Sequence, residues 1–175
     1  MRVLRISMYP PPGVGTPTTM GMRAADARVS LEEAEERNRE LHPEMFTVTE
    51  IFAVPDGSVE SATREIARRW HDRRETESRM AELFYWIASR IGPFKQRMTD
   101  PSKRPVIRVT AALPLSAEEI AYVFSQLARY PDCTPDVRVE MHSHKSGTTV
   151  ALDNGVVTIG PGSPPGGRGR YHGPN

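Results

Sequence analysis

Hydrophobic and polar positions are most clearly patterned between residues 105 and 159. Apolar residues alternate with polar residues from 105 to 113, as in a half-buried strand. A capping box at Ser116 and Glu119 then opens a helix, in which apolar residues recur every three or four positions until Pro131. We therefore predict a strand followed by a helix in the first half of this region.

Three more strands are predicted after this helix. Apolar residues alternate again from 137 to 142, and Lys145-Ser146-Gly147 provides a turn. Asn154-Gly155 then divides a β-rich stretch into strands over 148–153 and 156–159, because a type I′ turn needs positive φ at both central residues. The whole region is thus expected to fold as a strand, a helix and three strands.

The patterns in the first half of the chain are weaker. Residues 2 to 9 and 45 to 54 alternate and predict two strands, although Glu50 falls on the apolar side of the second one. A second capping box predicts a polar helix over 30 to 41. Residues 10 to 22 contain Pro and Gly but no apolar period, so we expect an extended arm or a surface loop there.

The longest helical pattern covers residues 58 to 97. Its apolar stripe breaks between Trp70 and Met80, where most residues are charged, so the pattern fits either one long helix or two helices that meet at a bend. Gly92-Pro93 is expected to end or kink the helix. Its aromatic side chains are expected either to pack in the core or to anchor an interface, because aromatic residues dominate interface hot spots. The interface candidates are Phe84, Tyr85, Trp86 and Trp70.

Together these patterns predict an α+β protein. We expect a mixed, mostly antiparallel sheet of about five strands, packed by two or three helices, with extended Pro/Gly-rich terminal segments. The predicted organisation is an N-terminal strand and Pro/Gly-rich arm over 1–29, a single α+β domain over 30–159 and a flexible Gly/Pro/Arg tail over 160–175. Because only 38% of the residues are hydrophobic, a core is expected only if the two ends are left out of it.

Charge and composition argue against several classes of protein. The formal net charge of +1 is far from the strongly basic balance of an electrostatically driven nucleic-acid binder. No apolar run approaches the ~20 residues that span a bilayer, so no membrane association is expected. Cys133 is the single cysteine, so neither an internal disulfide nor a multi-Cys zinc site can form. We expect a reducing location, either the cytoplasm or a particle assembled inside the cell.

One predicted strand carries a candidate metal site. Arg138, Glu140, His142 and His144 occupy alternate positions, and alternate residues of a strand point to the same face. At that spacing the two histidines are about 7 Å apart at Cα, close enough for both imidazoles to bind one zinc ion. Glu140 or Asp153 is the candidate third ligand. The alternative is a solvent-facing side of an antiparallel strand, which commonly carries Arg, Glu and His.

His142-Ser143-His144 resembles the His-x-His of the JAMM family of zinc isopeptidases, which also place this motif at the end of a strand. The resemblance covers three residues. The family continues with a Ser and an Asp at fixed spacing, whereas residues 148 to 155 contain no Ser and their Asp is out of register. The resemblance implies a zinc-dependent hydrolase, but the departure means that we do not assign the chain to this family.

These features support two hypotheses about function. The first is a non-enzymatic interaction or structural protein that works in a homo-oligomer or a larger assembly, such as a virion or another multi-subunit particle. It follows from the absence of a recognisable catalytic set, the low core content and the aromatic helix; it needs no cofactor, and its partner is a protein or a second copy of the chain. The alternative is a metal-dependent hydrolase or metal-binding regulator that uses zinc at His142 and His144.

Overall fold

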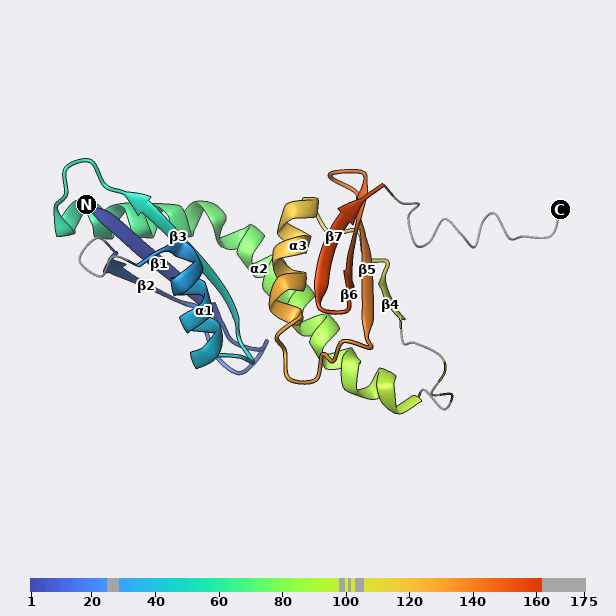
Figure 1. The fold of residues 1–175 in the computed structure, drawn as a ribbon. Helices are drawn as coiled ribbons and strands as arrows, with labels where there is room; N and C mark the ends of the chain where they lie inside the picture. Colours follow the sequence, from blue (N-terminus) through green and yellow to red (C-terminus); the bar gives the residue numbers. More distant parts are fainter. Residues whose placement is uncertain (25–28, 98–99, 101, 103–105, 162–175) are drawn as a thin grey trace. The chain divides into compact units, whose positions relative to one another are not determined.

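The structure is a computed structural model that describes residues 1–24, 29–97, 100, 102 and 106–161 (Figure 1). The described residues form three helices and two sheets, so the predicted α+β class is confirmed. The chain divides into two compact units, Met1–Ala81 and Glu82–Asn175, and the boundary lies inside the long helix α2 (Val59–Arg97). The sequence predicts instead one sheet in a single domain over 30–159; the difference arises because the strands of the first half pair only with one another.

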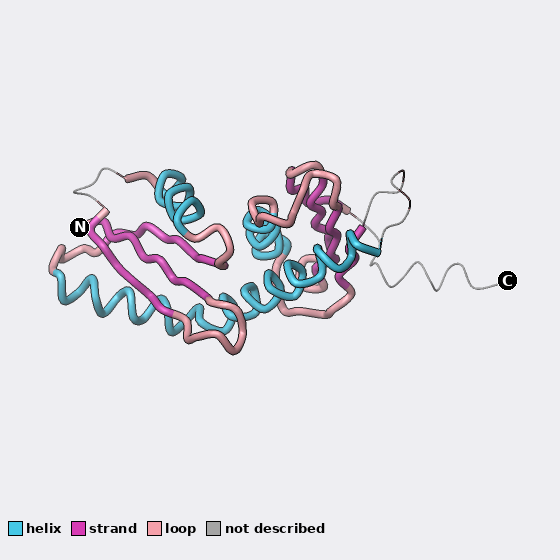
Figure 2. The backbone as a smooth tube through the Cα atoms, turned by 90° about the horizontal axis from the view of Figure 1, so that it is seen from below, coloured by secondary structure: helices cyan, strands magenta, loops and turns pink. Residues whose placement is uncertain are grey.

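Unit 1 is built around strand β1 (Arg2–Tyr9). This strand pairs antiparallel with β2 (Thr18–Arg23) on one side and with β3 (Phe46–Ala53) on the other. Helix α1 (Leu31–Leu41) packs on one face of this sheet and the first part of α2 packs on the other (Figure 2). The sheet of unit 1 therefore lies between two helical layers, and both faces of β1 are buried.

Each face of this sheet has its own apolar cluster, because successive side chains of a strand point to opposite faces. Val3 and Phe52 pack with Ala62 of α2 on one face. Leu4 packs on the other face with Ala34 of α1. The strand predicted over 2–9 is confirmed, but both its faces are covered rather than only one.

Residues 18 to 23 form strand β2 and not the arm or loop that the sequence predicts. This strand is at the edge of the sheet and most of its residues are exposed, and its only apolar alternation is the pair Met20 and Met22. It approaches α2 closely, because a Cβ added at Gly21 would collide with Cδ1 of Ile66. The prediction failed because two alternating methionines beside Thr, Gly and Arg are too short a pattern to identify a strand.

The sequence fits either one or two helices over residues 58 to 97, and the structure has one helix of 39 residues, α2. Glu77 lies within the break in the apolar stripe, yet it is fully buried and accepts a hydrogen bond from Arg5 of β1. This contact holds the charged stretch of the helix against the sheet of unit 1. The helix also continues through Pro93 to Arg97, so Gly92-Pro93 does not end it. None of the described helices combines the length and the apolar character that crossing a membrane requires.

Unit 2 contains the predicted order of a strand, a helix and three strands, which is confirmed (Figure 1). The four-stranded sheet has the order β4-β5-β6-β7. Its first two strands are parallel and joined through α3, and the others are antiparallel. The elements are β4 (Val106–Val109), α3 (Ala117–Leu127), β5 (Arg138–Ser143), β6 (Thr148–Asp153) and β7 (Val156–Gly160).

Local signals in the sequence place these elements. The Ser116 hydroxyl accepts the Glu119 N–H, and the Glu119 carboxylate accepts the Ser116 N–H, so the capping box forms as predicted. Asn154 and Gly155 both have positive φ, 51° and 72°, as the predicted type I′ turn requires. Strand β4 is shorter than the predicted strand over 105–113, and the predicted tail beyond residue 161 lies outside the described residues.

Candidate functional site

The residues predicted to bind metal lie on and beside one face of the sheet in unit 2. Glu140 and His142 share this face of β5 with Arg138, and His144 follows the end of the strand. The rings of His142 and His144 meet edge to face, with centroids 5.3 Å apart. His142 is buried, and its Nδ1 lies 3.4 Å from the hydroxyl of Thr149 on β6. The structure thus brings the two histidines together.

The two candidate carboxylate ligands are held by an arginine instead. Arg138 donates to Glu140 and to Asp153, each at 2.6 Å. Burial opposes ionisation of Glu140, but the hydrogen bond and charge of Arg138 outweigh it and lower the pKa of this carboxyl. The part of the chain that the structure describes holds no group of three His, Cys, Asp or Glu arranged to bind a metal ion. Zinc binding at His142 and His144 stays a prediction. A third ligand from Glu140 or Asp153 would have to break its hydrogen bond with Arg138.

The four aromatic interface candidates occupy different environments. Phe84 is fully buried in unit 2, where its ring meets Tyr130 edge to face at 5.8 Å. Trp86 is 39% exposed, and the guanidinium of Arg90 lies 3.7 Å from the centre of its ring. Tyr85 and Trp70 are half-buried. Phe84 therefore belongs to the core of its unit, and Trp86 is the most accessible of the four.

Unit 1 contains a buried ionic network that sequence reasoning missed. Arg5 and Glu77 are both fully buried, and the guanidinium donates to the carboxylate at 2.6 Å. Tyr9 donates its hydroxyl to the other oxygen of Glu77, also at 2.6 Å. Arg5 also donates to Glu50 of β3 at 3.2 Å and to Ser7 at 3.1 Å. We call these five residues the buried network.

Burial and charge act together in the buried network. Burial disfavours the charged form of Arg5, but the hydrogen bond and charge of Glu77 outweigh it, so the pKa of Arg5 is raised. Burial raises the pKa of Tyr9, and the hydrogen bond to Glu77 raises it further. Tyr9 therefore stays protonated and able to donate at all pH values near neutrality.

The raised pKa of Tyr9 predicts a loss of stability at alkaline pH. A tyrosine in the unfolded chain ionises at about pH 10, while the folded Tyr9 keeps its proton. The contribution of Tyr9 to the free energy of unfolding is therefore fully present below about pH 10 and falls as the pH rises above it. Urea unfolding between about pH 8 and pH 11 is expected to show a steeper decline in the free energy of unfolding for the native chain than for Tyr9→Phe. Equal slopes would contradict this account.

The centre of the buried network is closed to solvent. Its central groups, Arg5 and Glu77, have no exposed surface, so a substrate cannot reach them. The sequence carried two partial signals of it: Glu50 on the apolar side of its strand, and Glu77 within the break of the helical stripe. Neither signal identified the partner, because Arg5 and Glu77 are 72 positions apart.

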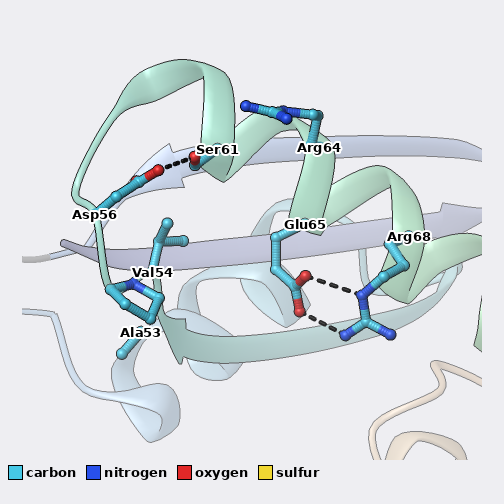
Figure 3. Close-up of a pocket in the computed structure, with 8 residues that line it drawn as sticks. Ala53, Val54, Asp56, Ser61, Arg64, Glu65 and Arg68 are labelled. Atoms are coloured by element: carbon cyan, nitrogen blue, oxygen red, sulfur yellow. Dashed lines mark hydrogen bonds and ion pairs between the residues drawn. The ribbon is translucent and has the colours of Figure 1, made fainter.

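A pocket of about 610 Å³ lies where β3 turns into α2 (Figure 3). Asp56 accepts hydrogen bonds from Ser61 and from the backbone of Ser58 at the start of the helix. Glu65 and Arg68 form an ion pair at 2.6 Å, and this hydrogen bond lowers the pKa of Glu65 to about 2. Arg64 pairs with Glu60 outside the lining, so the lining carries two acidic and two basic residues that all have partners, and this gives the pocket no distinct preference for an anion or a cation. Its lining residues are Ala53, Val54, Pro55, Asp56, Ser61, Arg64, Glu65 and Arg68.

The sheets of both units also end in strands with exposed apolar side chains. In unit 1, Met20 and Met22 of edge strand β2 are 48% and 49% exposed. In unit 2, Val156 and Ile159 of edge strand β7 are exposed to a similar degree. No described strand pairs with the outer side of β2 or β7. Such edges present backbone groups and apolar side chains to another chain.

Comparison with known proteins provides no relative from which a role could be transferred. No family model matches the chain, and no curated protein or solved structure matches it. The candidate sites must therefore be judged by their chemistry alone.

Proposed function

We propose that this protein is a non-enzymatic interaction protein that works in a homo-oligomer or in a larger assembly, such as a virion or another multi-subunit particle. The observation that carries the proposal is the exposure of large apolar side chains on the edge strands β2 and β7. Soluble proteins commonly protect an edge strand with charges, proline or a bulge, because an open edge pairs readily with another chain.

The chemistry of the other sites supports the same role. Arg5 and Glu77 of the buried network have no exposed surface, and Glu65 and Arg68 of the pocket beside α2 pair with each other. At the predicted metal site, Arg138 holds both carboxylates. The single thiol, Cys133, fits action in the cytoplasm or within a particle assembled inside the cell.

The proposal predicts that the purified full-length chain associates. Light scattering or mass photometry at micromolar concentration is expected to show particles larger than one chain, with a population that grows with concentration. The matched measurement uses the same protein in moderate urea, where association through edges should weaken before the units unfold. A chain that stays monomeric at the highest attainable concentration, and that also captures no partner, would refute the proposal.

A further inference from the structure

We propose that two copies of this chain pair through strand β2, antiparallel, about a two-fold axis at Gly21, so that two three-stranded sheets become one continuous sheet. This inference rests on the proposed function, because it names a second copy as the partner and β2 as the contact. Four observations carry it: the direction of the backbone groups of β2, the register of its side chains, the scarcity of edge protection and the glycine on the axis.

The open side of β2 presents backbone donors and acceptors. The N–H of Ala24 donates to the carbonyl of Arg2 at 3.0 Å, which makes these two residues a hydrogen-bonded pair of the ladder. Because such pairs alternate along an antiparallel ladder, the even-numbered residues of β2 bond to β1. The N–H and C=O groups of Thr19 and Gly21 therefore point away from β1. Two copies meeting at Gly21 can exchange reciprocal backbone hydrogen bonds there.

The side chains of β2 are complementary to themselves in this register. Met20 lies opposite Ile6 and Met22 lies opposite Leu4 on β1, so both methionines are on the face of the sheet that α1 packs against. With Gly21 on the two-fold axis, Met20 of each copy is directly opposite Met22 of the other. Two apolar pairs then form next to the existing cluster of Leu4 and Ile6.

A symmetric register with its axis at Met20 matches the side chains less well. An axis at Met20 would also suit the backbone, but it would leave Met22 opposite Thr18, an apolar side chain against a polar one. Centring on Gly21 pairs both methionines and spans nearly the whole strand. The register is therefore selected by the two methionines and not by the backbone.

The open edge of β2 has little protection, since its one charged residue is Arg23 at the end of the strand. Residues 18 to 23 contain no Pro, no Lys and no acidic residue, and their positions relative to β1 run without a bulge. Gly21 leaves room for the close approach of α2, since Ile66 fills the space that a Cβ would take. On the α2 face of the paired sheet, the two Ile66 side chains would lie near the axis and add apolar contact to it.

A charge test examines the register directly. In Met20→Lys/Met22→Lys each introduced lysine faces a lysine of the other copy, so the dissociation constant of the dimer is expected to rise by about tenfold or more. In Met20→Lys/Met22→Glu each lysine faces a glutamate, so the dimer is expected to persist. Mass photometry of the full chain measures both, and circular dichroism checks that each variant is folded. If both variants dissociate equally, or neither does, the register is wrong.

The matched control places the same charges on the other open edge, as Val156→Lys/Ile159→Lys on β7. This variant is expected to leave the dimer intact. If it dissociates the dimer while Met20→Lys/Met22→Lys does not, the pairing through β2 is refuted but the proposed function stands. A native chain that is monomeric at high concentration overturns the pairing, and if it also captures no partner, it overturns the proposed function as well.

Disulfide cross-linking provides a readout that does not depend on introduced charge. In a Cys133→Ser background, a mixture of Met20→Cys chains and Met22→Cys chains is expected to cross-link on oxidation, because directly opposite residues come within disulfide range. Each variant alone should not cross-link, because a residue and its own copy are then diagonal neighbours, about 7–8 Å apart. Cross-linking of Met20→Cys with itself would place the axis at Met20 and refute the register.

Discussion

Replacing Glu77 with leucine is expected to lower the free energy of unfolding by about 3–5 kcal/mol, because it leaves the charge of Arg5 buried without its main partner. Both side chains of this ion pair have no exposed surface, so water cannot replace the lost carboxylate. Tyr9 also loses the acceptor of its hydroxyl. Urea unfolding followed by circular dichroism measures the effect.

The double variant Arg5→Met/Glu77→Leu distinguishes the destabilisation caused by an unpaired buried charge from the stabilisation that the ion pair itself provides. Removing both charges leaves a mainly apolar contact, so this variant is expected to be more stable than Glu77→Leu alone. A matched control on the same helix is Glu60→Leu, which removes an exposed ion pair with Arg64 and should change stability by less than about 1 kcal/mol. If Glu77→Leu costs no more than Glu60→Leu, the buried network does not stabilise unit 1.

Replacing Phe84 with alanine is expected to cost about 3–5 kcal/mol, because it opens a cavity in the core of unit 2. Phe84 is fully buried, and the edge-to-face contact with Tyr130 is lost with it. Thermal and urea unfolding measure the loss. Phe84→Ala is therefore expected to lower the free energy of unfolding and not to remove a contact with a partner.

Trp86→Ala is the matched comparison on the same helix. Its ring is partly exposed and stacks with Arg90, so its removal is expected to cost about 1 kcal/mol, mainly from the cation–π contact and partial burial. The pair distinguishes the two roles that the sequence left open for these aromatic residues. Equal losses for Phe84→Ala and Trp86→Ala would mean that Trp86 is as much a core residue as Phe84.

The predicted candidate site shows where sequence reasoning reached its limit. Alternation along β5 correctly placed Glu140 and His142 on one face, because side-chain direction in a strand follows from the chain itself. Which groups they meet depends on the neighbouring strand. The register of β5 with β6 pairs Glu140 with Ala151 and brings Asp153 to Arg138, and no local pattern determines that register.

The candidate interface was harder to recognise than the candidate metal site. Residues 18 to 23 contain only two alternating apolar residues, Met20 and Met22, so this segment was predicted to be part of an extended arm or a surface loop. It becomes a strand because β1 supplies a ladder of backbone hydrogen bonds to it. Its open side, with Met20 and Met22 exposed, is recognisable only once its position at the end of the sheet is known.

The sequence by itself determined the α+β class, the order of elements in unit 2, the two capping boxes and the Asn154-Gly155 turn, because each depends on residues only a few positions apart. Only the tertiary structure decided that the strands form two sheets, that α2 is one helix and that β2 is an open edge. It also decided that Arg5 and Glu77 pair, because contacts between distant positions depend on how the elements are packed and not on any local pattern.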